Sequence, residues 1–441
     1  MAALVYAVVL GPRALTPSND NHYVHLAHSW LEGQLHVVGD APPGTNDWAC
    51  YDVDRGQACP ANTYRFPASE RDRYRWYVSF PPFPAVVALP AVAVAGLDLP
   101  DRLFWAILAG LAPAFLFVLL RWLSESGRSG RSLRDNLLLT GLFAFGSVFF
   151  FVAVQGTVWF AAHVVACILL PLYLLWSFDC RRPWLAGLAL GLLFVTRPTT
   201  LLLAAFFGVE ALRVSRPPDA SVPSKELPWM RRVVRWLGGV RWGRAAMHVA
   251  KLSLPVLAVA ALAMLHNAAR FDDPFEFGHT YLQIRWRPRI EKWGLFNYHY
   301  LGRNLAVFLA SLPWLTAAEP HVRISRHGLA LWLTTPNLLL VLWPRRVSAA
   351  MVGLYLGVAA VALVNLLYQN TGWVQFGYRF ALDYMAPLVV LLALGGRRFG
   401  AGFWAAALFA LAVNTFGAVT FDRMPELYDT DPTQRTLFQP D

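Results

Sequence analysis

The chain has 441 residues, of which 56% are hydrophobic and only 15% are charged. Soluble domains carry about 25% charged residues, so this composition excludes an ordinary soluble protein. The formal net charge of +11 could suggest nucleic acid, but the arginines lie in short loops between apolar runs, the pattern of basic cytoplasmic loops. We therefore predict an all-α, polytopic membrane protein that contacts membrane lipids and binds no nucleic acid.

The first apolar run, residues 1–10, is short for a transmembrane helix of about 20 residues. We expect either a partial first span or a chain whose true start lies upstream. The run has no basic segment before it and no small-residue cleavage site, so no cleavable signal peptide is evident.

Asp20 stands directly before an amphipathic segment, residues 23–31, whose apolar side chains recur at helical spacing. Two interpretations stay open: Asp20 could cap this helix, or it could be a carboxylate held at the membrane surface to take a proton. His22, His25 and His28 recur every third residue. They could bind zinc, although histidine is unremarkable at such an interface.

Residues 13–100 are too long and polar a stretch to be a turn, and we interpret them as a first extramembrane loop with surface helices. Cys50 and Cys59 lie in this loop, and a disulfide between them could persist on the oxidising side of a membrane. A metal pair is the weaker interpretation, because the spacing is not CxxC and no pair of histidines is close by. The apolar run 81–96 begins with two prolines and either spans or lies in the interface.

Charge decides between these two layouts. The next run, residues 103–123, ends in a loop with several arginines, which should be cytoplasmic. If residues 81–96 lie in the interface, every later basic loop falls on the cytoplasmic side. If they span, these loops fall on the outer side, which repeatedly contradicts the preference of basic loops for the cytoplasm. We therefore predict about 11 transmembrane helices in a single domain, 1–441. The predicted spans are residues 1–10, 103–123, 137–154, 159–178, 185–195, 201–212, 249–268, 329–343, 351–368, 380–394 and 403–421. The same layout makes residues 213–248 a basic cytoplasmic loop and residues 269–326 an extracytoplasmic loop.

Two arginines fall on the predicted outer face. Arg197 lies between two apolar runs, where a charge is costly and is by default a functional candidate. The alternative is an arginine whose long side chain simply reaches the interface. Arg379 opens a later span on the same face. Because a guanidinium binds oxyanions with two parallel N–H groups, such a pair suits a phosphate at the head-group level.

A polar segment, residues 266–281, follows a later span. Asp272, Asp273 and Glu276 could bind sugar hydroxyls or a cation, or they could form a capped turn that leaves a helix. His163, inside an apolar run, is interpreted as a hydrogen-bonded histidine of the helix bundle. The sequence contains no Walker A, GxSxG, HExxH or GxGxxG motif, so nothing indicates a soluble nucleotide donor.

Several short motifs, taken in order, resemble the GT-C superfamily of integral membrane glycosyltransferases. More narrowly they resemble the bacterial family 39-like group, with protein mannosyltransferases and aminoarabinose transferases as relatives. The motifs cover nearly the whole chain: Asp20 with Tyr23, Ala27, Leu31 and Gly33; residues 79–84 with their double proline; residues 187–198, which end in Thr-Arg-Pro; residues 271–279; and residues 377–380 with Pro387.

The resemblance implies a GT-C-type helical bundle with juxtamembrane helices in its first extracytoplasmic loop. It implies transfer of a sugar, with inversion, from a polyprenyl-phosphate donor to a lipid, glycan or protein acceptor outside a bacterial inner membrane. By position, Asp20 would be the general base, and Arg197 and Arg379 would hold the lipid phosphate. Residues that would contact sugar or acceptor are Tyr23, Glu276, His279 and Tyr281. No cofactor is certain, and a divalent cation is a candidate.

This chain departs from the family pattern at Asn21, which stands where many relatives have a second acid, and at His279, where tyrosine is usual. Three other functions are alternatives. A non-catalytic membrane scaffold would leave no reason for the paired outer arginines. A transporter or flippase for lipid-linked sugars predicts charged residues midway along the spans. A polysaccharide polymerase or ligase would also use outer-face arginines on lipid phosphates.

Overall fold

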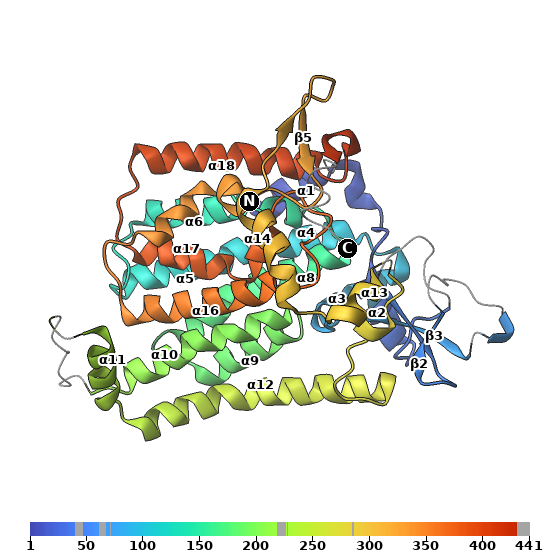
Figure 1. Cartoon of the computed structure of the whole chain (residues 1–441), viewed down its shortest axis with the longest axis horizontal. Coiled ribbons are helices and arrows are strands. Elements are labelled where there is room, and N and C mark those ends of the chain that lie inside the picture. The colour runs from blue at the N-terminus through green and yellow to red at the C-terminus, as the bar shows by residue number, and fades with distance from the viewer. Residues whose placement is uncertain are drawn as a thin grey trace.

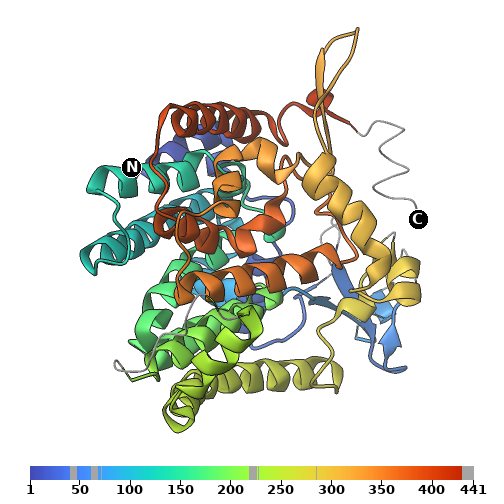
Figure 2. The ribbon, with the colours of Figure 1, turned by 60° about the vertical axis from the view of Figure 1, so that its left-hand side comes forward.

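The computed structural model describes residues 1–39, 47–60, 68–70, 72–217, 226, 228–284 and 286–429. Within these residues the chain is a bundle of helices whose long members run side by side, with small β-sheets at its edge (Figures 1 and 2). The strands β1–β3 lie at one end of the bundle, and the basic helix α11 lies at the other (Figure 1).

The α-helices are α1 (Ala2–Leu10), α2 (His22–Leu31), α3 (Phe83–Ala95), α4 (Asp101–Ala109), α5 (Leu111–Glu125), α6 (Leu133–Phe145), α7 (Phe149–Ala153), α8 (Val158–Ser177), α9 (Pro183–Phe194), α10 (Ala204–Val214), α11 (Trp229–Gly238), α12 (Trp242–Phe271), α13 (Arg287–Trp293), α14 (Leu301–Ala310), α15 (Leu331–Thr334), α16 (Ala349–Leu366), α17 (Met385–Leu394) and α18 (Ala401–Thr420). The strands are β1 (Trp48–Asp52), β2 (Gln57–Ala58), β3 (Tyr74–Val78), β4 (Trp314–Leu315), β5 (Val322–Ser325) and β6 (Tyr428–Asp429). Three of the 3₁₀ helices matter below: η5 (Pro198–Leu203), η8 (Pro336–Leu342) and η9 (Arg379–Asp383).

The prediction of a polytopic helical membrane protein is confirmed. Five helical segments of the described chain are long and apolar enough to cross a membrane: Asp101–Glu125, Val158–Cys180, Trp242–Phe271, Ala349–Leu366 and Ala401–Thr420. The other predicted runs are helical but short or broken, so the count of about 11 spans is not confirmed. The run 137–154 is divided into α6 and α7, and the run 329–343 into α15 and η8. Helix α12 begins at Trp242, inside the predicted loop 213–248.

Residues 81–96 contain a short helix, and their place in the interface stays a prediction. Helix α3 has 13 residues, too few for a span of about 20. It packs along α2, and the backbone N–H of Phe83 donates to the carbonyl of Val195 at 3.0 Å. Helix α2 itself begins at His22, with Asn21 at its N-cap position. The interpretation of Asp20 as the N-cap is therefore wrong.

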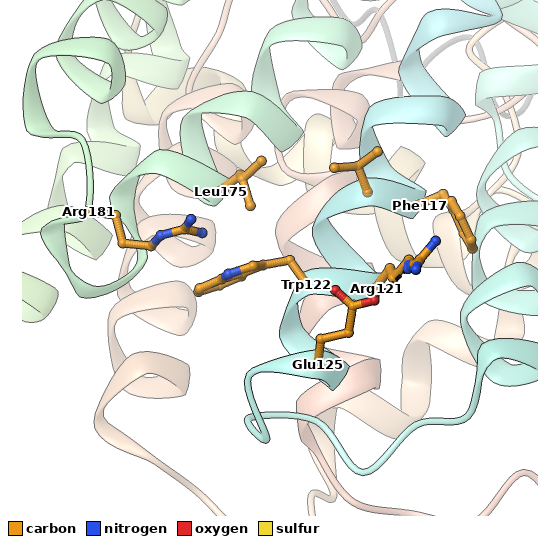
Figure 3. Close-up of a pocket in the computed structure, with 7 residues that line it drawn as sticks. Phe117, Arg121, Trp122, Glu125, Leu175 and Arg181 are labelled. Atoms are coloured by element: carbon orange, nitrogen blue, oxygen red, sulfur yellow. Dashed lines mark hydrogen bonds and ion pairs between the residues drawn. The ribbon is translucent and has the colours of Figure 1, made fainter.

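Basic loops from distant parts of the chain meet at one end of the bundle. Arg131, before α6, donates to the backbone carbonyls of Leu392 and Arg397, each at 2.7 Å. Arg128 pairs with Asp179, just after α8. A hollow of about 430 Å³ opens at this end between α5 and α8 (Figure 3). Its lining is Phe117, Val118, Arg121, Trp122, Glu125, Leu175 and Arg181.

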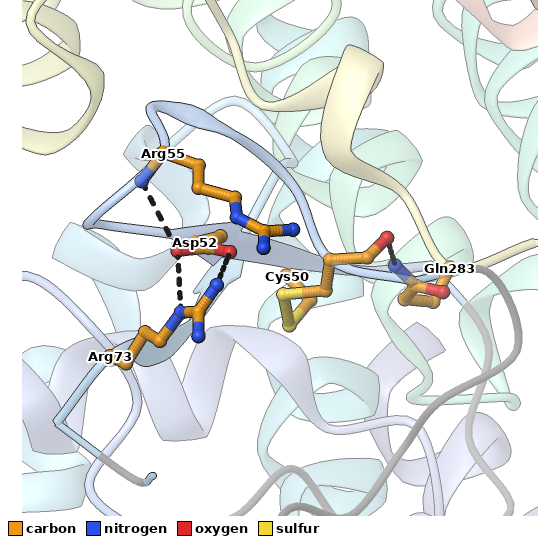
Figure 4. The surroundings of a disulfide bond; sticks show 6 residues. Cys50, Asp52, Arg55, Arg73 and Gln283 are labelled. Carbon is orange, nitrogen blue, oxygen red and sulfur yellow. Dashed lines mark hydrogen bonds and ion pairs between the residues drawn. A yellow bond between two sulfur atoms is a disulfide. The ribbon is translucent and has the colours of Figure 1, made fainter.

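The opposite end carries a three-stranded antiparallel sheet in the order β2-β1-β3. Every residue of β1 is buried, and the predicted Cys50–Cys59 disulfide is present, with a Cα–Cα distance of 5.4 Å (Figure 4). Arg73 donates to both carboxylate oxygens of Asp52, at 3.0 and 2.8 Å. This guanidinium holds the pKa of Asp52 below its usual value. Gln283 joins the sheet to the segment after α12, because its backbone N–H donates to the carbonyl of Trp48 at 2.9 Å.

Removing this cross-link should loosen the sheet. We expect the Cys50→Ser/Cys59→Ser variant to lose about 2–3 kcal/mol of stability, the range for a disulfide that closes a short loop. The measurement is the melting temperature of the detergent-purified protein with and without reductant. Reductant should lower the wild-type value and leave the variant unchanged. A wild-type melting temperature that is insensitive to complete reduction would contradict a stabilising role.

Candidate functional site

The first residues of α8 hold two segments that are distant in the chain and that each carry an acid. The backbone N–H of Val158 donates to the carbonyl oxygen of Asp20 at 2.9 Å. The indole Nε1–H of Trp159 donates to Oδ2 of Asp47 at 2.7 Å. Consecutive residues of one helix therefore hold the segments that carry Asp20 and Asp47.

Stacked aromatic rings hold α2 against β1 at this place. The rings of His22 and Trp48 lie 4.0 Å apart with an angle of 16° between their planes, and the ring of His25 meets Trp48 edge-on. Trp48 is fully buried. These two histidines are thus part of an aromatic cluster. Within the described ranges, no group of three or more His, Cys, Asp or Glu side chains could hold a metal ion.

Arg379 lies beside the start of α8. Its guanidinium carbon is 5.3 Å from the ring centroid of Phe160 and 5.4 Å from that of Phe380. Its Nη1 donates to the backbone carbonyls of Gly372 and, at 2.9 Å, Val374. Its Nε is buried and has no hydrogen-bond partner among the described residues. Arg379 is only 5% exposed, so it is a buried cation with hydrogen-bonding capacity that the described residues do not use.

Arg197 is anchored by a buried acid. Its Nε and Nη2 donate to the two carboxylate oxygens of Asp383 at 2.9 and 2.8 Å. Asp383 is completely buried, and it also accepts hydrogen bonds from Asn365 at 3.0 Å and Thr199 at 3.2 Å. Nδ1 of His163 lies 3.4 Å from the same carboxylate. Arg197 therefore does not simply extend to the interface, but is fixed by an acid from η9.

The two arginines face one aromatic ring. The guanidinium carbon of Arg197 is 5.3 Å from the centroid of Phe380, the ring that Arg379 also contacts. Nη1 of Arg197 makes no hydrogen bond to the described part of the chain. The charged or titratable groups that act on Arg379 include Arg197, Tyr368 and Asp47. The arrangement offers N–H groups from two cations, which is the chemistry of an oxyanion site.

That Asp20, Tyr23, Arg197 and Arg379 form one site stays a prediction, and the structure gives the surroundings of each residue. Tyr23 is fully buried, its hydroxyl has no hydrogen-bond partner within the described residues, and it acts electrostatically on Arg197. Asp20 lies at the start of α8, where its charge acts on Arg102 of α4. It is therefore close to the site, with a neighbouring cation of its own.

The other residues predicted to contact the sugar or the acceptor, Glu276, His279 and Tyr281, lie elsewhere. Both carboxylate oxygens of Glu276 accept hydrogen bonds within their own turn, from the N–H of Gly278 at 2.5 Å and from the hydroxyl of Thr280. The side chain of Asp273 also accepts a hydrogen bond within the turn, as the capped-turn interpretation predicted. His279 follows in the same turn, and the ring of Tyr281 packs on Tyr51 and Phe271 at the sheet. Burial there raises the pKa of Tyr281 to about 12. No described contact joins these residues to either arginine.

Sequence reasoning missed Asp383 and Asp47. Asp383 lies within the predicted span 380–394, where an acid is expensive unless it is paired, so its position alone was a signal. Asp47 carried no such signal, because it lies in a polar loop with several other acids. Only the fold shows that Trp159 holds it beside Arg379.

The chain resembles a protein of known structure. No family model and no curated protein matches the chain. Among solved structures, the chain is similar to the crystal structure of ArnT from Cupriavidus metallidurans bound to undecaprenyl phosphate, with a TM-score of 0.48 and 12% sequence identity. The match covers 93% of this chain and 61% of the ArnT chain, so this chain spans less than two thirds of that protein's length.

The Arg197–Asp383 pair should matter for stability far more than a surface pair. We expect Asp383→Asn to cost about 2–4 kcal/mol, because it leaves a largely buried guanidinium without its counter-charge. The matched control is Asp422→Asn, which removes an exposed carboxylate paired with Arg13 and should cost less than about 1 kcal/mol. Melting temperatures in the same detergent compare the two variants. Equal small losses would show that Asp383 does not hold Arg197.

Proposed function

We propose that this chain is a glycosyltransferase that moves a sugar from a polyprenyl-phosphate donor to an acceptor on the extracytoplasmic face of a bacterial inner membrane. The observation that carries the proposal is the pair of guanidinium groups over Phe380, each with N–H groups that the described chain leaves unused. The order of the motifs that resemble GT-C enzymes supports it independently.

A lipid phosphate fits this pair on physical grounds. Two cations over the same ring repel each other, and Asp383 neutralises only one of them closely. An anion with several oxygens can accept hydrogen bonds from both arginines and cancel the repulsion. A phosphate on a polyprenyl chain can reach such a site from within the bilayer. A nucleotide donor would need a binding motif that the sequence does not have.

In the proposed reaction, the acceptor oxygen attacks the anomeric carbon from the face opposite the phosphate. The bond between that carbon and the phosphate oxygen breaks, and the configuration at the anomeric carbon inverts. The electron pair stays on the phosphate, where Arg197 and Arg379 stabilise the developing charge. Asp20 takes the proton of the attacking hydroxyl, a contribution that is typically worth about 10²–10⁴ in rate.

The carboxylates at the start of α8 favour transfer over transport. A flippase needs charged groups along its path but no acid placed to take a proton. Arg197 lies between the end of α9 and the start of η5, and Arg379 is the first residue of η9, so both occupy the ends of helical segments. A polymerase or ligase would use the same arginines and differs only in its acceptor.

Arg379 provides the more direct test of phosphate binding, because its guanidinium has no carboxylate hydrogen bonded to it in the described chain. We expect Arg379→Ala to weaken binding of polyprenyl phosphate by about 10- to 100-fold, the loss of one or two charge-assisted hydrogen bonds. Arg379→Lys should recover part of this affinity. The control is Arg323→Ala, which alters an arginine of strand β5 that pairs with an exposed acid. An unchanged dissociation constant in Arg379→Ala would exclude this residue from phosphate binding.

Asp20 is tested through turnover. We expect Asp20→Asn to lower the release of polyprenyl phosphate from polyprenyl-phosphate hexoses or pentoses by about 10²–10⁴-fold. Binding of polyprenyl phosphate should stay the same. Asp54→Asn, a change of an exposed acid in the same loop, should leave turnover unchanged. Activity of Asp20→Asn equal to that of the wild type would remove Asp20 as the base. Movement of the donor across vesicles without turnover would support transport instead.

A further inference from the structure

The start of α8 holds the carboxylate of Asp47 through Trp159, and the next residue, Phe160, contacts Arg379, whose charge acts on Asp47. The backbone of Asp47 has a φ of +67°, in the left-handed region that aspartate and asparagine tolerate better than most residues. Its Oδ2 accepts the hydrogen bond from Trp159, and it immediately precedes the buried strand β1. The Cys50–Cys59 disulfide ties that strand to β2. The backbone conformation of Asp47, its hydrogen bond to Trp159 and the disulfide of the adjacent strand together fix the position of this carboxylate.

The groups that act on Asp47 come from three parts of the chain. The indole of Trp159 donates a hydrogen bond to it from α8, and the charge of Arg379 acts on it from η9. Tyr368, which follows α16, acts on both Asp47 and Arg379. Burial raises the pKa of Asp47, while the Trp159 hydrogen bond and the charge of Arg379 oppose that rise. The carboxylate is therefore held at some electrostatic cost next to the cation proposed to bind phosphate.

We propose that Asp47 is a second carboxylate of this site, whose charge competes with the lipid phosphate for Arg379, so that the phosphate binds more tightly when Asp47 carries a proton. This inference rests on the proposed function. It assigns Asp47 a positioning role: it sets how strongly Arg379 acts on the phosphate.

Such a competitor solves a problem that a buried and a partly buried arginine create together. Cations that stabilise a leaving phosphate also hold the free lipid phosphate after the reaction, and tight product binding slows turnover. An ionised carboxylate beside Arg379 lowers the affinity for the released phosphate. It also gives Arg379 a counter-charge while the site is empty. Asp383 cannot act as such a competitor, because both of its carboxylate oxygens already accept hydrogen bonds from Arg197.

The sign of the pH effect follows from the two charge states. Below its pKa, Asp47 is neutral and does not oppose the phosphate; above its pKa, the carboxylate is ionised and weakens binding. A phosphate monoester gains its second charge near pH 6, which strengthens binding as the pH rises. The two effects run in opposite directions. The informative quantity is therefore the ratio of dissociation constants of the wild type and a variant with a neutral residue 47, taken at each pH.

Asp47→Asn is the matched substitution. Asparagine tolerates the left-handed backbone, and its amide oxygen can still accept the Trp159 hydrogen bond, so the charge alone is removed. We expect Asp47→Asn to bind polyprenyl phosphate about 5- to 20-fold more tightly than the wild type at pH 8. The ratio should approach one as the pH is lowered, because the wild-type carboxyl then gains its proton and loses the charge that the variant lacks. Asp54→Asn in the same loop should match the wild type throughout.

The outcomes separate this inference from the proposed function. If the wild type binds polyprenyl phosphate, Arg379→Ala loses binding and Asp47→Asn equals the wild type at every pH, Asp47 does not compete and the inference is wrong while the proposed function stands. If the wild type does not bind polyprenyl phosphate, the proposed function fails and the inference fails with it. Melting temperatures check that Asp47→Asn is folded. If it is not, the same ratio measured with Asp47→Ser decides the question.

Discussion

The ion pair between Arg197 and Asp383 is the constraint on which the arrangement of the site depends. A charge inside a helical bundle is tolerated only when a counter-charge and hydrogen bonds replace its water. Asp383 receives two hydrogen bonds from Arg197 and two more from Thr199 and Asn365. These contacts join the junction of α9 and η5 to η9 and α16, elements far apart in the chain. Arg379 begins the same short helix η9, so the pair also fixes where the second arginine lies.

This constraint gives the two arginines different roles. Arg197 has a permanent carboxylate partner, so most of its binding capacity serves the fold. Arg379 donates from Nη1 to backbone carbonyls, which carry no net charge, and contacts the rings of Phe160 and Phe380. A buried cation held this way keeps much of its positive potential available for an anion. The sequence presents the arginines as equivalent, whereas their surroundings make Arg379 the stronger phosphate-binding candidate.

Much of the architecture could be predicted from local sequence, because hydropathy and charge act over short stretches. Each apolar run became helical, Cys50 and Cys59 formed their bond, and the residues after the double proline formed a short helix. The number of full spans could not be predicted this way. Runs such as 137–154 and 329–343 are broken within the bundle, where helix ends pack against protein and need not reach both sides of a membrane.

The candidate site was less predictable, because its decisive contacts are far apart in sequence. Arg197 and Asp383 are 186 positions apart, and Trp159 and Asp47 are 112 positions apart. No local pattern states which acid will meet which cation. Asp20 illustrates this limit, since the residue singled out by its motif lies beside Arg102, while an acid from a less distinctive stretch lies beside Arg379.

The two acid-bearing segments at the start of α8 also bear on Asn21, which stands where a second acid is expected. Asn21 leaves Asp20 without an acidic neighbour in the sequence, but the fold holds a second acid-bearing segment at the same helix start. Val158 holds the backbone of Asp20, and the next residue, Trp159, holds the side chain of Asp47. Asp47 immediately precedes strand β1 of the cross-linked sheet. Because the start of α8 holds the segments of both acids, a change in this helix start should affect Asp20 and Asp47 together.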